Sequence, residues 1–464
     1  MPQRKELSAL PETTLEEEVY DPLKGADTYG GPPLREWQKR ALSDWEAADY
    51  SGVVEAVTGT GKSLVGVAAI HQTVINAGGK ALVLVPTVAL LEQWRRQVVL
   101  SLPRVRVGTL GGGSNDTFYD NDVLISTVHS AYKDPPVPTS LGLLIADEVH
   151  RYGSQSFGLA LSPAYARRLG LTGTFERQLD DGIRDTLIPY FGPVTTSYQY
   201  GQALEEGVVA PFHLAFVGTE FSHSERLAYE EATRKCDDAK TRLIGEYDYD
   251  PEWANFFALV TAITSTAKRD GRWDEEVELC QQYLSGFSKR RVLTAEASGK
   301  EELIGKFRQA FSKLSGTLVF TETMDSARRL AWICNQATPS FPLTSESTPA
   351  ERREKLAAFA GGRLKVLCAP RILDEGIDVP EAELAVIVAA SSTRRQMIQR
   401  MGRVIRKKHD GRSARILITY VIGTGEDPNL GGHEAFLDQI IPHASSVIMP
   451  EGDVSTEILN WLTN

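Results

Sequence analysis

Short runs of apolar residues recur in two separate parts of the chain, and most are followed by a turn signal and a stretch with helical spacing. Apolar runs of about four to eight residues with such boundaries are typical of strands buried in a parallel sheet. The sequence therefore predicts two α/β blocks, each with its own parallel sheet. The expected strands are 53–57, 81–85, 122–127 and 141–146 in the first block, and 317–322, 364–369, 383–390 and 414–421 in the second.

Between the two blocks, residues at about 222–313 are highly charged and nearly free of β-rich runs, which predicts a helical insertion. In the first block, 88–100 is predicted to be a helix, and the helical spacing of Leu91, Trp94 and Val98 assigns these side chains to core packing. We expect four regions: an N-terminal arm at 1–33, a first domain at 34–208, a second domain at 209–445 that contains the insertion, and a C-terminal tail at 446–464.

Length and charge narrow the possible functions. At 464 residues the chain is too long for one core, and its net charge of −11 argues against a protein that coats nucleic acid by bulk attraction. The net charge does not exclude a narrow nucleic-acid-binding track lined by backbone amides and hydroxyls. No apolar run is long enough to span a membrane and the start carries no secretory signal, so we expect no membrane contact and a cytoplasmic location. The four scattered cysteines predict reduced thiols and no metal site.

The segment AVTGTGKS (56–63) lies between a predicted strand and a predicted helix, where a phosphate-binding loop is found. Its glycines let the backbone wrap a phosphate, its lysine can reach the β- and γ-phosphates, and its serine hydroxyl can ligate Mg²⁺. Ala56 replaces the first glycine of the usual pattern, but with Lys-Ser in place a ligand-free tight turn is the weaker alternative. We expect ATP and Mg²⁺ to bind here, held by Thr58, Gly59, Thr60, Gly61, Lys62 and Ser63.

The run LLIADEVH (143–150) ends in two adjacent carboxylates and, two residues later, a histidine. If its strand is the neighbour of the strand before the loop, Asp147 lies beside the phosphates and can hold the metal through its water shell. Glu148 can then orient and deprotonate the attacking water, and His150 can couple this site to another motif. The alternatives are a solvated strand end for the acidic pair and a structural role for the histidine.

A basic helix is predicted downstream, within STRRQMIQRMGRVIRKK (392–408). Arg403 and Arg406 are three residues apart and share one helical face, which can present two guanidinium groups to a polyphosphate. A basic surface helix is the alternative, but it does not explain Gly402, because a glycine weakens the middle of a helix.

These motifs, in this order, resemble those of superfamily 2 helicases and translocases, most closely the XPB-type branch. The resemblance extends from Leu34 to Val421 and implies two tandem RecA-like domains with an ATP cleft between them. Motif III reads TGT where TAT or SAT is commoner, and Gly173 is expected to loosen that loop. The further matching segments are LREWQ (34–38), VLVPT (83–87), ISTVHSAY (125–132), LGLTGT (169–174), VFTET (319–323), RILDEGIDVPEA (371–382) and QRMGRVIR (399–406).

The resemblance also implies a role for each matching residue. Besides Lys62, Asp147 and Glu148, the catalytic groups would be two arginine fingers reaching across the cleft, Arg403 and Arg406. Further nucleotide contacts would come from Arg35 and Gln38, whose segment is similar to the family's adenine-reading motif, and from Gly376 and Asp378. Hydrolysis would be linked to domain movement through His150, Thr172, Thr174 and Gln399. The phosphate backbone of a nucleic-acid strand would be contacted by Pro86, Thr87, Thr127, Thr321 and Arg371.

The sequence thus predicts an ATP-dependent nucleic-acid translocase or helicase, with DNA favoured as the polymer. A DExH-type RNA helicase remains an alternative, because contacts to a phosphate backbone do not distinguish strongly between DNA and RNA. A further alternative is an ATP-switched nucleic-acid clamp that recruits a protein partner such as a nuclease.

Overall fold

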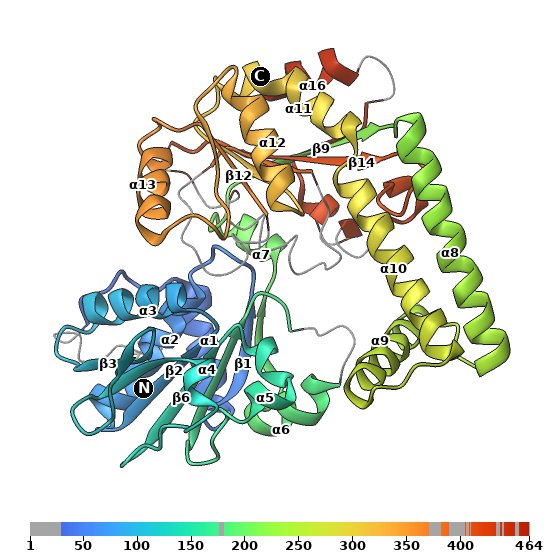
Figure 1. The fold of residues 1–464 in the computed structure, drawn as a ribbon. Helices are drawn as coiled ribbons and strands as arrows, with labels where there is room; N and C mark the ends of the chain where they lie inside the picture. Colours follow the sequence, from blue (N-terminus) through green and yellow to red (C-terminus); the bar gives the residue numbers. More distant parts are fainter. Residues whose placement is uncertain are drawn as a thin grey trace, which may run out of the picture.

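The computed structural model describes residues 29–175, 181–370, 382–388, 404, 408, 410–432, 437–438, 440–450 and 454–463. Within these residues the chain forms two RecA-like α/β domains, one above the other in Figure 1, and a helical arm extends from the upper domain. Each domain is built on its own sheet. No helix in the ranges just given is long and apolar enough to cross a lipid bilayer.

The first sheet has the strand order β4-β3-β5-β2-β6-β7-β1-β8 and is parallel except for the short β3–β4 pair. Its central strands are buried on both faces, which explains why they form unbroken apolar runs in the sequence. The strands are β1 (Ser51–Ala56), β2 (Lys80–Val85), β3 (Val107–Gly111), β4 (Ser114–Asn115), β5 (Val123–Thr127), β6 (Gly142–Asp147), β7 (Arg167–Thr172) and β8 (Val194–Tyr198).

Three tryptophans anchor the helices of the first domain: Trp37 and Trp45 on α1, and Trp94 on α3, are all fully or almost fully buried. Burial of side chains this large stabilises the helices more than their intrinsic propensity does. A short 3₁₀ helix, Val149–Gly153, follows β6 directly. The α-helices are α1 (Glu36–Ala47), α2 (Lys62–Ile70), α3 (Val88–Ser101), α4 (Val128–Ala131), α5 (Gln155–Gly158), α6 (Ile188–Phe191) and α7 (Tyr200–Glu205).

The second sheet has the order β11-β12-β10-β13-β14-β9-β15, and every pair of neighbours is parallel. Strand β9 pairs with β14 along its full length, so a segment that precedes the arm lies beside one near the end of the chain. The strands are β9 (Phe212–Thr219), β10 (Thr317–Phe320), β11 (Ser340–Pro342), β12 (Val366–Ala369), β13 (Leu384–Ile387), β14 (Ala414–Val421) and β15 (Ser446–Ile448).

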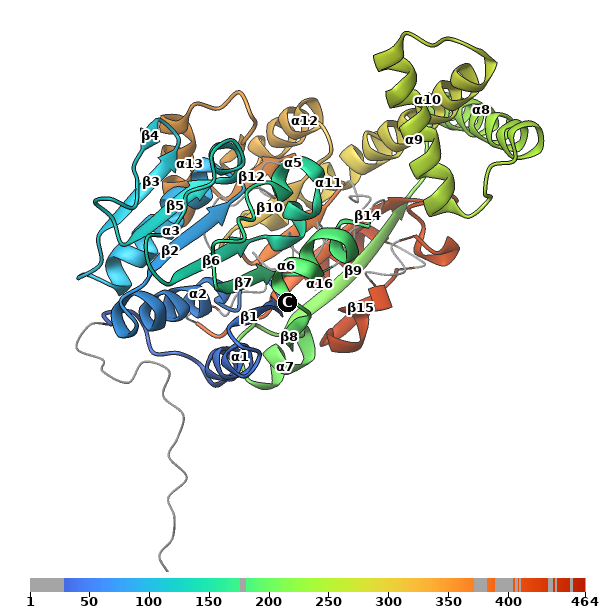
Figure 2. The ribbon, with the colours of Figure 1, turned by 90° about the horizontal axis from the view of Figure 1, so that it is seen from below.

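The arm consists of α8 (His223–Tyr247), α9 (Trp253–Asp270) and α10 (Glu275–Ala295), and it projects away from both sheets in Figures 1 and 2. Helices α8 and α10 approach closely at Gly286, where a Cβ atom would lie 2.9 Å from the backbone oxygen of Ala232. By contrast α11 (Ser298–Phe311), from the same segment of the sequence, packs on the second sheet against α12 (Met324–Asn335).

Residues 446–463, expected from the sequence to be a tail, are part of the second domain. Strand β15 extends the sheet beside β9, and α16 (Val454–Thr463) buries Ile458 and Leu462 against α11. A strand of three residues is too short to show a period of two in the sequence. Helix α13 (Pro349–Ala360) completes the second domain among the α-helices of the described ranges.

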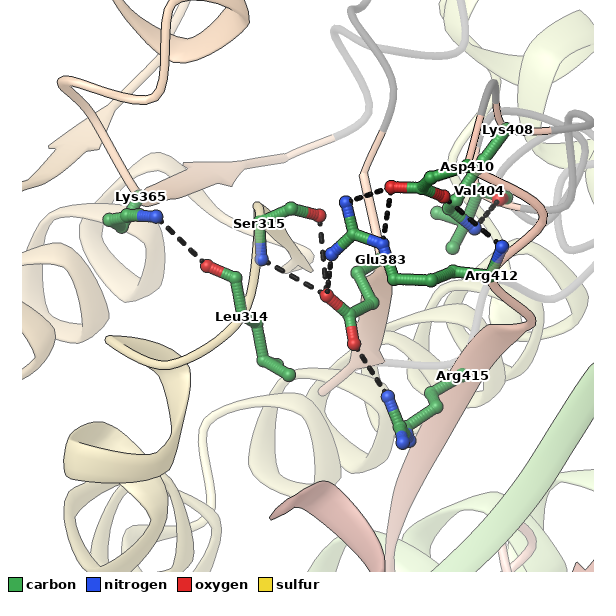
Figure 3. Close-up of polar contacts among 9 residues, drawn as sticks. All are labelled: Leu314, Ser315, Lys365, Glu383, Val404, Lys408, Asp410, Arg412 and Arg415. Atoms are coloured by element: carbon green, nitrogen blue, oxygen red, sulfur yellow. Dashed lines mark hydrogen bonds and ion pairs between the residues drawn. The ribbon is translucent and has the colours of Figure 1, made fainter. Parts of the chain in front are cut away.

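A buried carboxylate connects three strands at the end of the second sheet opposite to the strands' carboxyl ends (Figure 3). Glu383, just before β13, is 6% exposed. Its Oε2 accepts a hydrogen bond of 3.0 Å from the backbone N–H of Ser315, which precedes β10. Arg415 of β14 donates to Oε1 at 2.6 Å, and Arg412 donates to Oε2 at 3.0 Å. The carboxylate therefore ties together the starts of β10, β13 and β14.

We expect Glu383→Ala to destabilise the second domain by about 3 kcal/mol, because it leaves the largely buried Arg415 without its partner. The measurement is chemical denaturation followed by far-UV circular dichroism. Asp410→Ala is the control, since it removes another carboxylate bonded to Arg412 but from a half-exposed position, and it should have a much smaller effect. Equal losses in the two variants would contradict a structural role for Glu383.

Candidate nucleotide and nucleic-acid site

The loop between β1 and α2 has the geometry of a phosphate-binding loop. Gly59 and Gly61 have φ angles of 93° and 91°, in the left-handed region that glycine adopts without strain. Lys62, the first residue of α2, donates from Nζ to the backbone oxygen of Ala56 at 2.8 Å, so its ammonium group lies over the loop. The Thr60 hydroxyl donates to the backbone oxygen of Val57 at 2.7 Å and closes the turn.

Arg35 and Gln38, which are expected to recognise adenine, are hydrogen-bonded to the backbone of this loop. Arg35 donates to the backbone oxygen of Thr60 at 2.8 Å, and the buried Gln38 donates to that of Gly61 at 3.0 Å. Gln38 Oε1 also accepts from the backbone N–H of Arg35 at 2.8 Å, which fixes both residues at the start of α1. Their contact with the loop is therefore direct, while a contact with adenine stays a prediction.

The acidic pair lies at the carboxyl end of β6, but β6 is not the neighbour of β1. The condition under which the sequence analysis placed Asp147 beside the phosphates is therefore not met, because β7 lies between the two strands. Both strands still end at the same edge of the sheet, and the charge of Lys62 acts on Asp147.

The pKa of Asp147 is raised to about 6, chiefly by burial and then by the neighbouring charge of Glu148. Hydrogen bonding from Trp94 and the charge of Lys62 oppose this shift. The Asp147 carboxylate and the Ser63 hydroxyl are oxygen donors, the ligand type that Mg²⁺ prefers. A buried carboxylate with a raised pKa also gains from a bound cation. The residues present thus fit a magnesium ion held together with nucleotide phosphates.

Glu148 has a left-handed backbone, with φ 53° and ψ 51°. This conformation is uncommon for a residue with a side chain, and such strain is concentrated at functional sites. It turns the chain sharply between β6 and the following 3₁₀ helix.

His150 connects the acidic pair to the end of β7. Its Nδ1 lies 3.0 Å from Thr172 Oγ1 and 3.6 Å from Glu148 Oε2, and the ring is 2% exposed. Thr172 Oγ1 in turn donates to the backbone oxygen of Thr174 at 2.8 Å. With the threonine proton directed there, Nδ1 of His150 is the donor to Thr172. These contacts bring together three of the four residues predicted to couple the site.

The predicted strand contacts of the first domain lie at the carboxyl ends of β2 and β5. Thr87 caps α3, accepting from the backbone N–H of Leu90 at 3.3 Å. The hydroxyl of Thr127 lies 3.0 Å from the hydroxyl of Ser130. A Cβ on Gly111 of β3 would lie 2.5 Å from Thr127 Oγ1. Three strand ends therefore meet at one edge, where open α/β sheets bind their ligands.

In the second domain, Thr321 follows β10 and is fully buried, and its hydroxyl donates to the backbone oxygen of Thr323 at 3.0 Å. Among the described residues, the Thr321 hydroxyl thus stabilises its own loop. Its direct contact with a nucleic-acid strand stays a prediction. The remaining predicted residues lie outside the described ones: Arg371, Gly376, Asp378, Gln399, Arg403 and Arg406.

Sequence reasoning missed two residues of the site. Trp94, assigned to core packing, donates from Nε1 to Asp147 Oδ2 at 2.8 Å. Glu55, a partly exposed residue of β1, accepts from the backbone N–H of Phe175 at 2.7 Å and so holds the end of motif III. A carboxylate inside an apolar strand run was a signal for Glu55. Nothing in the spacing of Trp94 distinguished it from its apolar neighbours.

Two family descriptions match the chain: "Type III restriction enzyme, res subunit" over residues 32–177, and "Helicase conserved C-terminal domain" over residues 301–408. The second match covers the part of the chain in which the arginine-rich motif lies.

Two similar proteins extend these matches over most of the chain. The DNA 3'-5' translocase XPB2 of Sulfurisphaera tokodaii is 28% identical over 86% of this chain and 84% of its own length. The DNA 3'-5' helicase XPB of Kineococcus radiotolerans is 27% identical over 87% of this chain but only 62% of its own length. This chain therefore spans less than two thirds of the second relative.

The fold also matches solved helicase-like structures. S. cerevisiae Dbp5 bound to RNA and ADP BeF3 superimposes with a TM-score of 0.58 at 14% identity, covering 92% of this chain and 93% of that one. This likeness concerns the two-domain fold alone. The matched families and relatives make the chain similar to superfamily 2 helicases of the XPB-like branch.

Proposed function

We propose that this chain is an ATP-dependent translocase or helicase that acts on DNA, with Mg²⁺ as its metal cofactor. The observation that carries the proposal is the contact series from the acidic pair through His150 to Thr172, beside a phosphate-binding loop. The two relatives are named for 3'-5' action on DNA, which supports DNA as the polymer and the same polarity here.

In the proposed reaction, the loop amides and Lys62 bind the β- and γ-phosphates of ATP. Asp147 and Ser63 would hold the metal, which when bound would supply positive charge against the charge that develops on the phosphates. Glu148 orients a water molecule against the γ-phosphate and accepts its proton. The arginine fingers Arg403 and Arg406 complete the site from the second domain when the cleft closes.

Hydrolysis reaches the nucleic acid through His150 and motif III. A change at Glu148 alters the position of His150, whose ring is bonded to Thr172 at the end of β7. The loop after β7 also adjoins the phosphate-binding loop, since a Cβ on Gly173 would lie 3.3 Å from Thr58 Oγ1. Opening and closing of the cleft then shifts one domain along the strand.

Steady-state ATP hydrolysis without polymer and with single-stranded DNA, duplex DNA or RNA of equal length tests the polymer. Stimulation by DNA alone supports the proposal, and stimulation by RNA alone would replace it with an RNA helicase. Nucleotide-dependent binding without stimulation would instead indicate a clamp, for which a nuclease or other protein partner is proposed. The cytoplasmic location stays a prediction.

Lys62→Ala and Glu148→Gln are expected to abolish nucleic-acid-stimulated hydrolysis for different reasons. Lys62→Ala should weaken nucleotide binding, whereas Glu148→Gln should bind ATP and lower kcat by about 100-fold or more, because it removes the proton acceptor. Nucleotide titrations and steady-state rates measure the two effects. Glu205→Gln, an exposed substitution of the same type on α7, is the control. Full stimulation in either site variant would refute the mechanism.

His150→Ala is expected to separate hydrolysis from movement. ATP hydrolysis should stay within about tenfold of wild type, while DNA strands displaced per ATP should fall further, because the contact between the acidic pair and Thr172 is lost. His223→Ala, at the exposed start of α8, is the matched control. A proportional fall of hydrolysis and displacement would mean that His150 has no coupling role.

A further inference from the structure

Trp94 connects α3 to two parts of the nucleotide site. Its Nε1 donates a 2.8 Å hydrogen bond to Asp147 Oδ2. Its ring lies against the backbone of α2 at Gly66, where an added Cβ would be 2.6 Å from Trp94 Cη2. The side chain is 1% exposed. One residue of α3 therefore contacts both the carboxylate at the end of β6 and the helix that follows the phosphate-binding loop.

The hydrogen bond from Trp94 fixes the orientation of the Asp147 carboxylate. Oδ2 accepts from the indole, and Oδ1 accepts from the backbone N–H of Glu148 at 3.1 Å. Two donors on different oxygens define the plane of the carboxylate, and each oxygen keeps a lone pair for a metal-bound water. Groups of this kind orient metal ligands and tune their affinity.

The same helix begins at a residue proposed to contact the nucleic-acid strand. Thr87 is the N-cap of α3, and Trp94 follows seven residues later, about two turns or about 10 Å along the helix axis. A regular helix of this length moves largely as one body. If a bound nucleic-acid strand displaces the start of α3, the indole of Trp94 therefore moves with the helix. This indole contacts both Asp147 and α2.

Core packing alone does not explain why the indole of Trp94 donates a hydrogen bond to a carboxylate. Trp37 is fully buried, yet its Nε1 has no hydrogen-bond partner within the described part of the chain. Trp45 donates to a backbone oxygen, that of Arg168, at 2.9 Å. Within its described residues, the first domain thus contains one buried indole N–H without a hydrogen-bond partner and another that donates to a backbone oxygen. Only Trp94, among these three, bonds a carboxylate of the proposed reaction.

We propose that Trp94 is a positioning residue that transmits a strand-induced displacement of α3 to the Asp147 carboxylate and to α2. The proposal rests on the proposed function, because it takes Thr87 as a strand contact and Asp147 as the residue that holds magnesium.

The test is the linkage between DNA binding and nucleotide binding in Trp94→Phe. The dissociation constant for fluorescein-labelled DNA is measured by anisotropy with and without Mg²⁺ and a non-hydrolysable ATP analogue. In wild type the two constants should differ by about 5–150-fold. In Trp94→Phe their ratio should fall towards one, and the Mg²⁺ concentration that half-saturates analogue binding should rise by about 10–100-fold.

Trp45→Phe is the matched control, since it removes a buried indole hydrogen bond in the same domain, and it should keep the wild-type ratio. A Trp94→Phe protein that also keeps this ratio overturns the proposal. A wild-type protein without any linkage overturns the proposed function itself, so the two failures are distinguishable. If Trp94→Phe does not fold, a tryptophan analogue with sulfur in place of the N–H, incorporated at position 94, removes the donor at nearly constant shape.

Discussion

A parallel sheet brings the carboxyl ends of all its strands to one edge, and the nucleotide site of the first domain depends on this constraint. The phosphate-binding loop follows β1, the acidic pair ends β6, and motif III ends β7. Because β7 lies between β1 and β6, its end lies between the phosphate-binding loop and the acidic pair. In the proposed mechanism, this strand order makes the threonines of motif III the connection between ATP and the rest of the domain.

The balance of charges at this edge is a second requirement of the proposed metal site. Burial and the neighbouring Glu148 both raise the pKa of Asp147, while Lys62 and Trp94 lower it. The pKa of this carboxyl is thus raised, and a bound cation would favour its ionised form. The left-handed backbone of Glu148 belongs to the same arrangement, since it turns the chain sharply at the end of β6.

The second domain shows how the arm is joined to the core. Arg291 of α10 donates to Glu322 at 2.8 Å, and Glu296 accepts from Thr323 at 2.5 Å, so the loop after β10 is bonded to the base of the arm. Farther out, α8 and α10 hold each other through a small core that includes Cys236, Cys280 and Tyr283. The arm is therefore a packed element attached at the loop after β10, within the VFTET segment (319–323).

The sequence by itself determined the buried central strands, the phosphate-binding loop and the acidic pair, because burial on both faces leaves unbroken apolar runs and phosphate binding demands glycine and Lys-Ser. Short strands such as β4, β11 and β15 have too few residues to show a period, and only the tertiary structure revealed them. The tertiary structure also decided the strand order and the partner of Trp94, which lies 53 residues away along the chain. Periodicity reports which side chains are buried, whereas long-range pairing decides what a buried polar atom meets.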